Sequence, residues 1–385
     1  MIPYGRQTIS DEDVRAVVEV LRSDFLTQGP VVPRFERAIA DHCGVAHAVA
    51  VNSATSALHI ACLALGVGPG DRVWTSPNTF VASANCARFC GAAVDFVDID
   101  PSTCNMSTPA LAAKLAAAAA CGSLPKVVIP VHFAGLPCDL ADIHALAQRY
   151  GFRVIEDASH AIGARYRDSV IGDCRFSDIT VFSFHPVKII TTAEGGMATS
   201  QSAALARTMR LLRTHGVTRD AAELQRSDEG PWYYEQQCLG FNYRMTELQG
   251  ALGLSQLTQL SRRIARRHEL ADAYDAQLAP LPLILPRRLA ESRSALHLYV
   301  VQLDPLRTPL NRRVVFERLR AAGIGVAVHY IPVHTQPDFQ TLGFRAGDFP
   351  ASESYYARCL SLPMFAALTE VEQGRVCEAL RRTLT

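Results

Sequence analysis

Residues 126–155, KVVIPVHFAGLPCDLADIHALAQRYGFRVI, contain a complete strand–helix–strand pattern. Lys126–Val131 and Arg153–Ile155 are short apolar runs, and Leu140–Tyr150 between them places apolar residues at helical spacing. Runs that are apolar throughout, rather than alternating with polar residues, are typical of strands buried on both faces of a sheet. The stretch therefore predicts two parallel strands joined by a crossover helix, the unit from which α/β folds are built.

The same alternation continues on both sides of this stretch, over the first two-thirds of the chain. Further helices are predicted at Ser56–Leu65 and Val81–Cys90. Further strands are predicted at His47–Val51, Arg72–Thr75, Ala93–Val97 and Ile179–Phe184. Such a series predicts an α/β fold with a mainly parallel sheet covered by helices on both faces. Functional groups in that architecture gather at the carboxyl ends of the strands.

The pattern changes near residue 246. A long helix is predicted over residues 246–278, and Pro280, Pro282 and Pro286 then mark a boundary. Beyond the prolines we predict a strand, a helix and a second strand, at Leu296–Leu303, Asn311–Ala322 and Gly325–Tyr330. We therefore expect a large domain of residues 1–250, N-terminal arm included, and a smaller C-terminal α+β domain of residues 251–385 joined to it by the long helix.

Composition and charge narrow the class of protein. The chain has 385 residues, 38 of them Lys or Arg and 37 Asp or Glu, for a formal net charge of +1. That balance argues against a dedicated nucleic-acid-binding protein, and we interpret the basic run of Arg262, Arg263, Arg266 and Arg267 as a solvated helix face. The 49% of hydrophobic residues can supply a substantial core. No signal peptide and no membrane span are expected.

The eleven cysteines include no CxxC pair, which favours reduced thiols over a disulfide framework. Cys86 and Cys90 lie four residues apart in a predicted helix, and we expect them to be small buried side chains rather than metal ligands. We therefore expect a cytoplasmic protein with no metal site.

Lysine is rare in this chain. Only three of the 38 cationic residues are lysines, namely Lys114, Lys126 and Lys188. Lys188 follows a predicted strand in the segment FSFHPVK, residues 182–188. A partly desolvated lysine has a lowered pKa and can form a Schiff base, which arginine cannot do. The local sequence is equally compatible with a lysine that reaches out from a buried segment. Lys114 and Lys126 are interpreted as surface charges.

Three further segments carry candidate functional groups. Asp157 ends an apolar strand, where a buried acid needs a cation such as a protonated pyridine ring. The alternative is a carboxylate exposed to solvent at the strand end. The small hydroxyl residues of Asn52–Ala57 precede a helix, where they suit a phosphate as well as ordinary capping. Phe80 could stack on a planar cofactor, although a single phenylalanine is usually part of the core.

Together, in this chain order, these residues resemble the fold-type I, pyridoxal-phosphate-dependent sugar aminotransferases of the DegT/StrS type over nearly the whole chain. The resemblance lies in the segments LTQG (26–29), NSATSAL (52–58), FSFHPVK to EGG (182–196), PWYYEQ (231–236) and GFNYRM (240–245). It implies an aspartate-aminotransferase-like fold in which the large domain holds a mainly parallel seven-stranded sheet.

The resemblance also implies roles by position. Lys188 would bind pyridoxal phosphate as a Schiff base, Asp157 would pair with its pyridine nitrogen, His160 would lie near its phenolic oxygen and Phe80 would stack on its ring. The phosphate would be bound by Ala54, Thr55 and Ser183, and by Asn242 of the neighbouring subunit, which implies a homodimer with shared active sites. The sugar-nucleotide pocket would include Tyr4, Leu26, Thr27, Gln28, Gly29, Ala54, Ser183, Asn242, Val328, His329 and Tyr330.

Within the family, the resemblance is greatest to transaminases of pseudaminic acid synthesis. These transfer an amino group from L-glutamate, through pyridoxamine phosphate, to UDP-2-acetamido-2,6-dideoxy-β-L-arabino-hex-4-ulose and give UDP-4-amino-4,6-dideoxy-N-acetyl-β-L-altrosamine. Related sugar 3-dehydratases carry histidine in place of the Schiff-base lysine, and this chain keeps Lys188, with His185 three residues earlier. Transamination is therefore favoured over dehydration.

Two alternatives stay open. The substrate could be that of another nucleotide-sugar 4-aminotransferase, of the UDP-4-amino-4-deoxy-L-arabinose or GDP-perosamine type. The chain could also be a non-catalytic regulator that binds pyridoxal phosphate, because fold alone does not determine activity. For the carboxylate of glutamate Arg244 is a candidate, and a surface role for this arginine is equally open.

Overall fold

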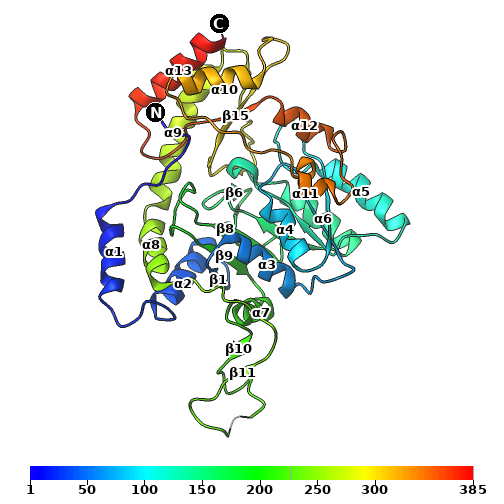
Figure 1. Ribbon diagram of the computed structural model, residues 1–385, viewed down its shortest axis with the longest axis vertical. Coiled ribbons are helices and arrows are strands. Elements are labelled where there is room, and N and C mark those ends of the chain that lie inside the picture. Colours follow the sequence, from blue (N-terminus) through cyan, green and yellow to red (C-terminus); the bar gives the residue numbers. More distant parts are fainter. Residues whose placement is uncertain (227, 385) are drawn as a thin grey trace.

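The computed structural model describes residues 1–226 and 228–384 (Figure 1). Its centre is a seven-stranded sheet with the strand order β1-β9-β8-β5-β4-β2-β3. Six of the strands run in one direction and β9 alone runs in the opposite direction. The prediction of a mainly parallel sheet in an α/β fold is therefore confirmed. The strands are β1 (His47–Val51), β2 (Arg72–Thr75), β3 (Ala93–Phe96), β4 (Val127–Ile129), β5 (Arg153–Asp157), β8 (Ile179–Ser183) and β9 (Gly196–Ser200).

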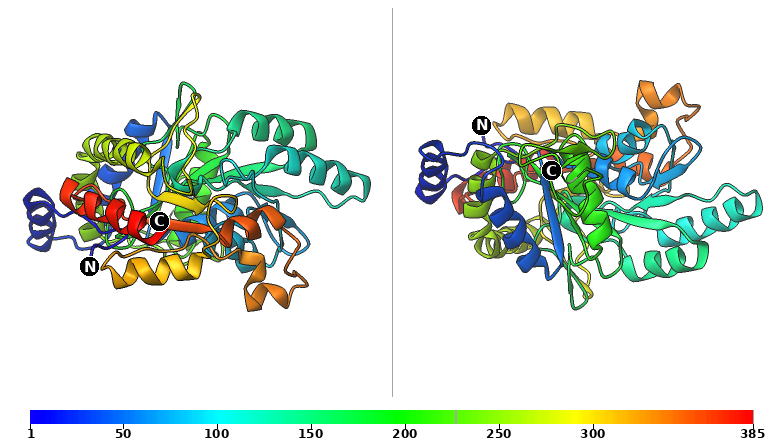
Figure 2. Two further views of the ribbon diagram at one scale, coloured as in Figure 1. Left: turned by 90° about the horizontal axis from the view of Figure 1, so that it is seen from above. Right: turned by 90° about the horizontal axis from the view of Figure 1, so that it is seen from below.

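Helices cover both faces of the sheet, as expected. One face packs against α3 (Ala54–Ala64), α4 (Ala82–Phe89) and α7 (Ala203–Arg213), and the other against α2 (Val31–Cys43), α5 (Thr108–Ala120) and α6 (Leu140–Tyr150). The two hydrophobic clusters between the layers share no residue, because successive strand residues point to opposite faces. Seen from above and below, α5 lies at the edge of the molecule opposite α1 (Asp11–Leu21) (Figure 2).

The one strand of the seven-stranded sheet that was not predicted from the sequence is β9. Its first residue, Gly196, follows Gly195 and Glu194, and such a pair of glycines is typical of a turn. In the structure a Cβ on Gly196 would lie 2.5 Å from the carbonyl carbon and oxygen of Ser53. Glycine is therefore needed here because the start of β9 lies directly against the beginning of α3.

A second, three-stranded sheet forms the core of the C-terminal region. Its strands are β12 (Leu283–Ile284), β14 (Tyr299–Leu303) and β15 (Cys359–Leu362), with β14 in the centre. The long helix predicted over residues 246–278 is wrong, because the chain forms two helices, α8 (Glu247–Leu257) and α9 (Leu260–Leu278). Between them the Thr258 hydroxyl and amide both donate to the carbonyl of Ser255, which tightens the last turn and ends α8.

The predicted strand at Gly325–Tyr330 is also wrong. Only Ala327 pairs with β15, through an isolated bridge to Ser361. Gly325 instead donates to the carbonyl of Ile2, and Ile2 pairs with Ile324, so this segment holds the N-terminal arm rather than a full strand. The domain boundary between residues 250 and 251 stays a prediction.

The basic run on α9 is not simply a solvated face. Arg262 is exposed, but Arg263 and Arg267 are buried. Arg263 donates to the carbonyls of Thr8 and Ile189 and to the Gln256 side chain. Arg267 donates to the carbonyls of Leu296, His297 and Met364 at 3.0–3.1 Å. These two arginines therefore tie α9 to segments far apart in the sequence.

Lys114 and Lys126 are likewise not free surface charges. Lys126 Nζ donates to the carbonyl of Gly66 and pairs with Asp71 at 2.9 Å. Lys114 Nζ donates to the carbonyl of Phe96, pairs with Asp95 at 2.7 Å and lies 4.9 Å from the ring centre of Trp74. Lys114 thus links α5 to the end of β3, and Lys126 links the start of β4 to the loop between α3 and β2. Each lysine keeps part of its side chain in solvent.

The cysteines agree with the sequence-based expectation. All eleven are free thiols, and Cys86 and Cys90 are buried. Over residues 1–226 and 228–384, no cluster of His, Cys, Asp or Glu is arranged to hold a metal ion. In the same part of the chain, none of the helices combines the length and apolar character that a membrane span requires.

The remaining elements lie around this frame. A narrow hairpin, β10 (Val217–Thr218) and β11 (Glu235–Gln236), projects from the body beyond α7, and both termini lie at the opposite end (Figure 1). A third small sheet has the strand order β13-β6-β7, and the rest are helices of the C-terminal region. They are β6 (Arg165–Tyr166), β7 (Ser169–Val170), β13 (Ser292–Arg293), α10 (Arg312–Ala321), α11 (Pro337–Gln340), α12 (Pro350–Tyr356) and α13 (Glu370–Leu384).

Candidate active site

A cavity of about 450 Å³ opens at the carboxyl ends of β5 and β8. Residues from both the large sheet and the C-terminal region form its wall. It brings together ten of the site residues predicted from the sequence, namely Tyr4, Ala54, Thr55, Phe80, Asp157, His160, Ser183, Lys188, His329 and Tyr330. The rule that functional groups gather at strand ends therefore located the cavity.

Asp157, the last residue of β5, is buried and oriented by two donors. Ser83 Oγ donates to Asp157 Oδ2 at 2.6 Å, and the Ser159 amide donates to Oδ1 at 3.1 Å. Ser83 comes from α4, where its hydroxyl also lies 2.8 Å from that of Thr79. The carboxylate is thus fixed in direction and keeps further lone pairs for a ligand.

Lys188 lies in the loop after β8, and its amide donates to the carbonyl of His185. Enclosure in the cavity wall lowers the pKa of its amine to about 8, and the nearby Asp157 carboxylate partly opposes this effect. An amine with such a pKa is largely protonated at neutral pH but supplies an appreciable neutral fraction. It can therefore act both as a nucleophile and as an acid–base group.

Three histidines beside Lys188 are uncharged near neutral pH. Burial, reinforced by the Lys188 charge, lowers the pKa of His160 and of His297 well below the usual range, and it lowers that of His329 to about 4. His160 Nε2 lies 3.0 Å from the Tyr330 hydroxyl, and the two rings are stacked. Among the described residues, no atom hydrogen-bonds to the buried Nδ1 of His160.

One wall of the cavity has the form of an anion site. Ser53 is the N-cap of α3 and its Oγ accepts from the Ser56 amide, which leaves Ala54 and Thr55 in the first helical turn. Ser183 ends β8 beside them and lines the same cavity. Free amides and the positive end of the helix dipole favour a phosphate at this position.

These features fit pyridoxal phosphate. The first turn of α3 suits its phosphate, the oriented Asp157 carboxylate suits its pyridine nitrogen, and His160 lines the same cavity with one buried ring nitrogen unpartnered. The side chain of Phe80 is 60% exposed, so it is not a core residue, and it lies at the cavity wall 6.5 Å from the Tyr330 ring centre. Stacking of Phe80 on a cofactor ring stays a prediction.

Several predicted site residues lie outside this cavity. Gln28 and Gly29 line a separate cavity of about 240 Å³, together with Glu36, Arg213 and Arg244. Four further predicted residues do not line the main cavity, namely Leu26, Thr27, Asn242 and Val328. Asn242 is exposed and forms an isolated β-bridge with Thr214. Their roles in a substrate pocket stay predictions, and for Asn242 the prediction already involves a second subunit.

Sequence reasoning missed Ser83, Thr79 and His297. Thr79 and Ser83 have helical spacing just after β2, which is a weak signal for two hydroxyls on one side of the chain. His297 lies before β14, more than 100 residues from Lys188, and its ring is 4.4 Å from that of His160. Only the packing of the C-terminal region against the large sheet brings His297 to the cavity.

Known proteins resemble this chain over its full length. A spore coat polysaccharide biosynthesis protein, SpsC of Bacillus subtilis, is 40% identical over 383 residues, covering 99% of this chain and 96% of the relative. The structure of Helicobacter pylori PseC, an aminotransferase involved in the biosynthesis of pseudoaminic acid, superposes with a TM-score of 0.90 at 30% identity, covering 100% and 99%. The putative sugar aminotransferase Spr1654 of Streptococcus pneumoniae, in its pyridoxal phosphate form, gives 0.88 at 27% identity over both complete chains.

The similarity confirms the aminotransferase fold that the resemblance implied, including its large seven-stranded sheet. It also agrees with the cavity, where a lysine, an oriented aspartate and an anion site meet. The model of a family of pyridoxal-phosphate-dependent enzymes matches residues 7–381. The chain is therefore an aminotransferase and belongs to the DegT/DnrJ/EryC1/StrS aminotransferase family.

Proposed function

We propose that this aminotransferase uses pyridoxal phosphate, bound through Lys188, to transfer an amino group from L-glutamate to C4 of a UDP-linked 4-keto-6-deoxy-N-acetylhexosamine. The product would be UDP-4-amino-4,6-dideoxy-N-acetyl-β-L-altrosamine. The observation that carries the proposal is the Lys188 amine in one cavity with the oriented Asp157 carboxylate. Similarity to PseC supports the choice of sugar.

When bound, the cofactor supplies an aldehyde that captures amines and a ring that takes up electrons from the adjacent carbon. The first turn of α3 and Ser183 would bind its phosphate. Asp157, oriented by Ser83 and Ser159, would accept a hydrogen bond from the protonated pyridine nitrogen. The neutral His160, which lines the cavity, would lie near the phenolic oxygen.

Lys188 would also move the protons. With a pKa of about 8 its amine can take a proton from the carbon of the amino donor and return one to C4 of the sugar. The neighbouring histidines are neutral at that pH, so they do not compete as acids. Asp157 next to Lys188 keeps part of the amine protonated, which supplies the acid form as well as the base form.

A homodimer with shared sites is part of the proposal. Glutamate and a UDP-sugar are both anionic, yet Lys188 is the one Lys or Arg side chain among the described residues of the cavity wall. Cations from a second subunit would complete the site, and Arg244 and Asn242 lie near the surface outside this cavity. Arg244 is our candidate for a carboxylate of glutamate.

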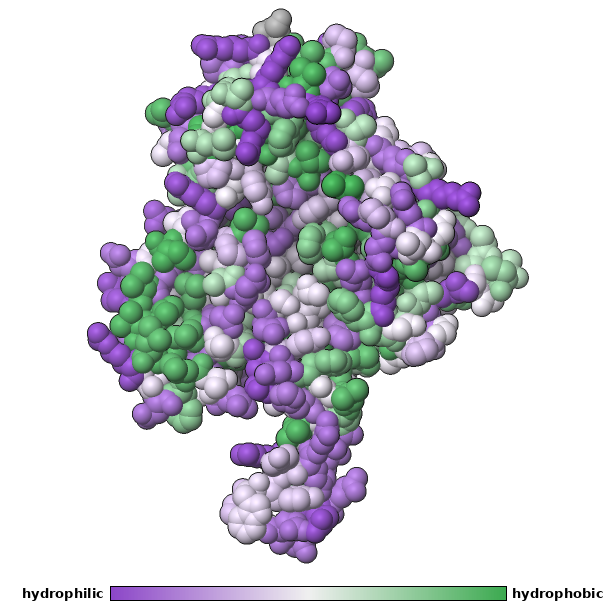
Figure 3. Space-filling view, in the orientation of Figure 1, coloured by the Kyte–Doolittle hydropathy of each residue, from purple (hydrophilic) through white to green (hydrophobic). Residues whose placement is uncertain are grey.

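An apolar surface supports the same assembly. Val14 and Leu21 of α1, with Phe25 and Leu26 just after it, are each about half exposed, at 49–56%. Figure 3 shows hydrophobic residues gathered on this side of the molecule, over α1 and α8. A contiguous apolar face of this kind is typical of a subunit interface. It also adjoins Thr27, Gln28 and Gly29, which are predicted to reach the substrate.

The proposal is tested by an amino-transfer assay. Purified protein with pyridoxal phosphate and L-glutamate would be given a panel of UDP- and GDP-linked 4-ketosugars, and the amino sugar and 2-oxoglutarate would be measured. We expect fastest turnover of the UDP-linked 4-keto-6-deoxy-N-acetylhexosamine, complete loss in Lys188→Ala, and retained activity in the control Lys126→Arg. Preference for a GDP-linked or a pentose substrate would refute the proposed sugar and favour the alternatives. No 2-oxoglutarate with any ketosugar would refute transfer from glutamate.

A further inference from the structure

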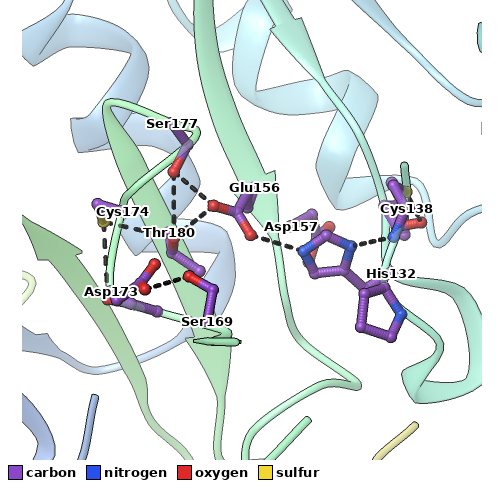
Figure 4. Close-up of polar contacts among 12 residues, drawn as sticks. His132, Cys138, Glu156, Asp157, Ser169, Asp173, Cys174, Ser177 and Thr180 are labelled. Atoms are coloured by element: carbon purple, nitrogen blue, oxygen red, sulfur yellow. Dashed lines mark hydrogen bonds and ion pairs between the residues drawn. The ribbon is translucent and has the colours of Figure 1, made fainter. Parts of the chain in front are cut away.

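Behind Asp157 lies a second buried acid that takes no part in the cavity. Successive residues of β5 point to opposite faces of the sheet, so Glu156 faces the side of α5 and α6 while Asp157 faces that of α3 and α4. The side chain of Glu156 is 2% exposed. Figure 4 shows its carboxylate between the His132 ring on one side and the hydroxyls of Ser177 and Thr180 on the other.

The Glu156 carboxylate accepts hydrogen bonds from three side chains. His132 Nε2 lies 2.8 Å from Oε2, and Thr180 Oγ1 donates to Oε1 at 3.1 Å. Ser177 Oγ also donates to Oε1. Three donors directed at one carboxylate favour its ionised form over its protonated form.

The hydrogen bond at the other ring nitrogen of His132 shows that this ring is neutral. The backbone amide of Cys138 donates to His132 Nδ1 at 3.0 Å, and an amide can donate only to a nitrogen that carries no proton. The single ring proton is therefore on Nε2, where it points to Glu156. Because His132 is neutral, the His132–Glu156 pair carries a full negative charge inside the protein.

In the described part of the chain, no lysine or arginine pairs with Glu156. The thiols of Cys43, Cys138 and Cys174 lie near it, and their pKa values are raised by burial and by Glu156 itself. The acids Asp173 and Asp139 act on Cys43 and Cys138 in the same direction, so they add no positive charge. The groups that can carry positive charge lie across the strand, in the active-site cavity.

We propose that Glu156 is a remote negative charge that raises the proton affinity of the Lys188 amine and of the pyridine nitrogen beside Asp157. The pyridine part rests on the proposed function, whereas the Lys188 part does not. Glu156 does not touch the cavity, so it is a positioning residue that acts through the field behind the site. The His132 amide also donates to the Asp157 carbonyl at 3.1 Å, so the same pair fixes the end of β5.

The expected size of the effect follows from Coulomb's law. At an effective dielectric constant of about 20, a unit charge at roughly 10 to 20 Å from a titrating group changes its pKa by about 0.5 to 1. Lys188 is faced by Asp157, which raises the pKa of its amine, and by His160, His297 and His329, which are neutral near pH 7. Removing the Glu156 charge should therefore move the amine titration to lower pH.

The rarity of lysine makes this titration measurable. In cofactor-free protein, brief acetylation across a pH series followed by peptide mass spectrometry reports the neutral fraction of Lys188, with Lys114 and Lys126 as internal references. In Glu156→Gln we expect the Lys188 midpoint to fall by about 0.5 to 1 pH unit. In the control Ser177→Ala, which loses a donor and keeps the charge, we expect no change.

An unchanged midpoint in folded Glu156→Gln, or an equal fall in Ser177→Ala, would overturn the proposal. If Glu156→Gln does not fold, the wild type still decides. Nitrogen NMR of ¹⁵N-histidine-labelled protein should show His132 in the neutral Nε2–H form, and a doubly protonated ring would refute the buried charge. These readouts need no substrate, so their failure is distinguishable from failure of the proposed function.

The cofactor part has its own readout. In protein loaded with pyridoxal phosphate, the pH at which the visible absorbance changes should also fall in Glu156→Gln and stay constant in Ser177→Ala. A shift of Lys188 in the cofactor-free protein without any shift in the loaded protein would overturn the claim for the cofactor alone.

Discussion

At Asp157, one of the two hydrogen bonds that orient the carboxylate comes from a side chain, that of Ser83. Ser83 Oγ donates to the carboxylate at 2.6 Å, and the bond is buried. Hydrogen bonds to charged groups contribute about 1.5–3 kcal/mol, so Ser83→Ala should lower turnover by about 10- to 100-fold. Asp157→Asn keeps the shape but loses the charge, and we expect a loss of about 100-fold or more.

Steady-state turnover of both variants checks this expectation. The control is Ser107→Ala, which removes the N-cap of α5 outside the site and should cost stability without lowering turnover. Turnover of Ser83→Ala equal to that of the control would show that Ser83 does not position Asp157.

Some features of individual site residues could be predicted from the sequence and others could not. That Lys188 and Asp157 lie at strand ends could be predicted, because Lys188 follows an apolar run and Asp157 ends one, and both line the cavity. Their roles stay predictions. An acid at the end of this strand was expected to need a cation, and the structure gives the neighbouring Glu156 three neutral donors instead. Such partners come from 21 to 24 residues away, and only the folded sheet brings them together.

At the scale of elements, six of the seven strands of the large sheet could be predicted, whereas β9 and the faces of the helices could not. The β1, β2 and α6 boundaries agree with the prediction because apolar runs end abruptly at turn residues. The four arginines of α9 have the spacing of one helix side, which does not reveal that Arg263 and Arg267 meet buried carbonyls. That outcome depends on where the N-terminal arm and the C-terminal region pack.

Arg267 supplies a prediction at this scale. Its guanidinium serves three buried carbonyls, so Arg267→Ala would leave them without a donor. We expect unfolding to become easier by about 3 kcal/mol, seen as a lower midpoint in urea. The matched variant Arg262→Ala, on the exposed side of α9, should change stability by less than about 0.5 kcal/mol. Equal midpoints for the two variants would contradict the assigned role of Arg267.

For the whole molecule, the central expectation is a site built by two subunits. The cavity of one chain holds Lys188, while Asn242 and Arg244 lie outside it. If Asn242 completes the neighbouring site, Lys188→Ala and Asn242→Ala would be defective in different subunits of that site. A mixed dimer would then contain one site with both defects and one site with neither.

Mixing the two inactive variants tests this arrangement. After dissociation and reassociation, half of the dimers are mixed, so activity should recover to about a quarter of the wild-type value. Lys188→Ala mixed with Asp157→Ala is the control, because both residues line the same cavity and every site keeps a defect. No recovery in the first mixture would mean that Asn242 acts in its own subunit or not at all.

The claim on which everything else depends is the covalent role of Lys188, and one measurement tests it directly. The protein is loaded with pyridoxal phosphate, reduced with borohydride, digested and analysed by mass spectrometry. Only three lysines can react, and we predict the pyridoxyl group on Lys188 alone, with labelling lost when L-glutamate is added before reduction. A pyridoxyl group on Lys114 or Lys126 instead, or none on Lys188, would contradict the account.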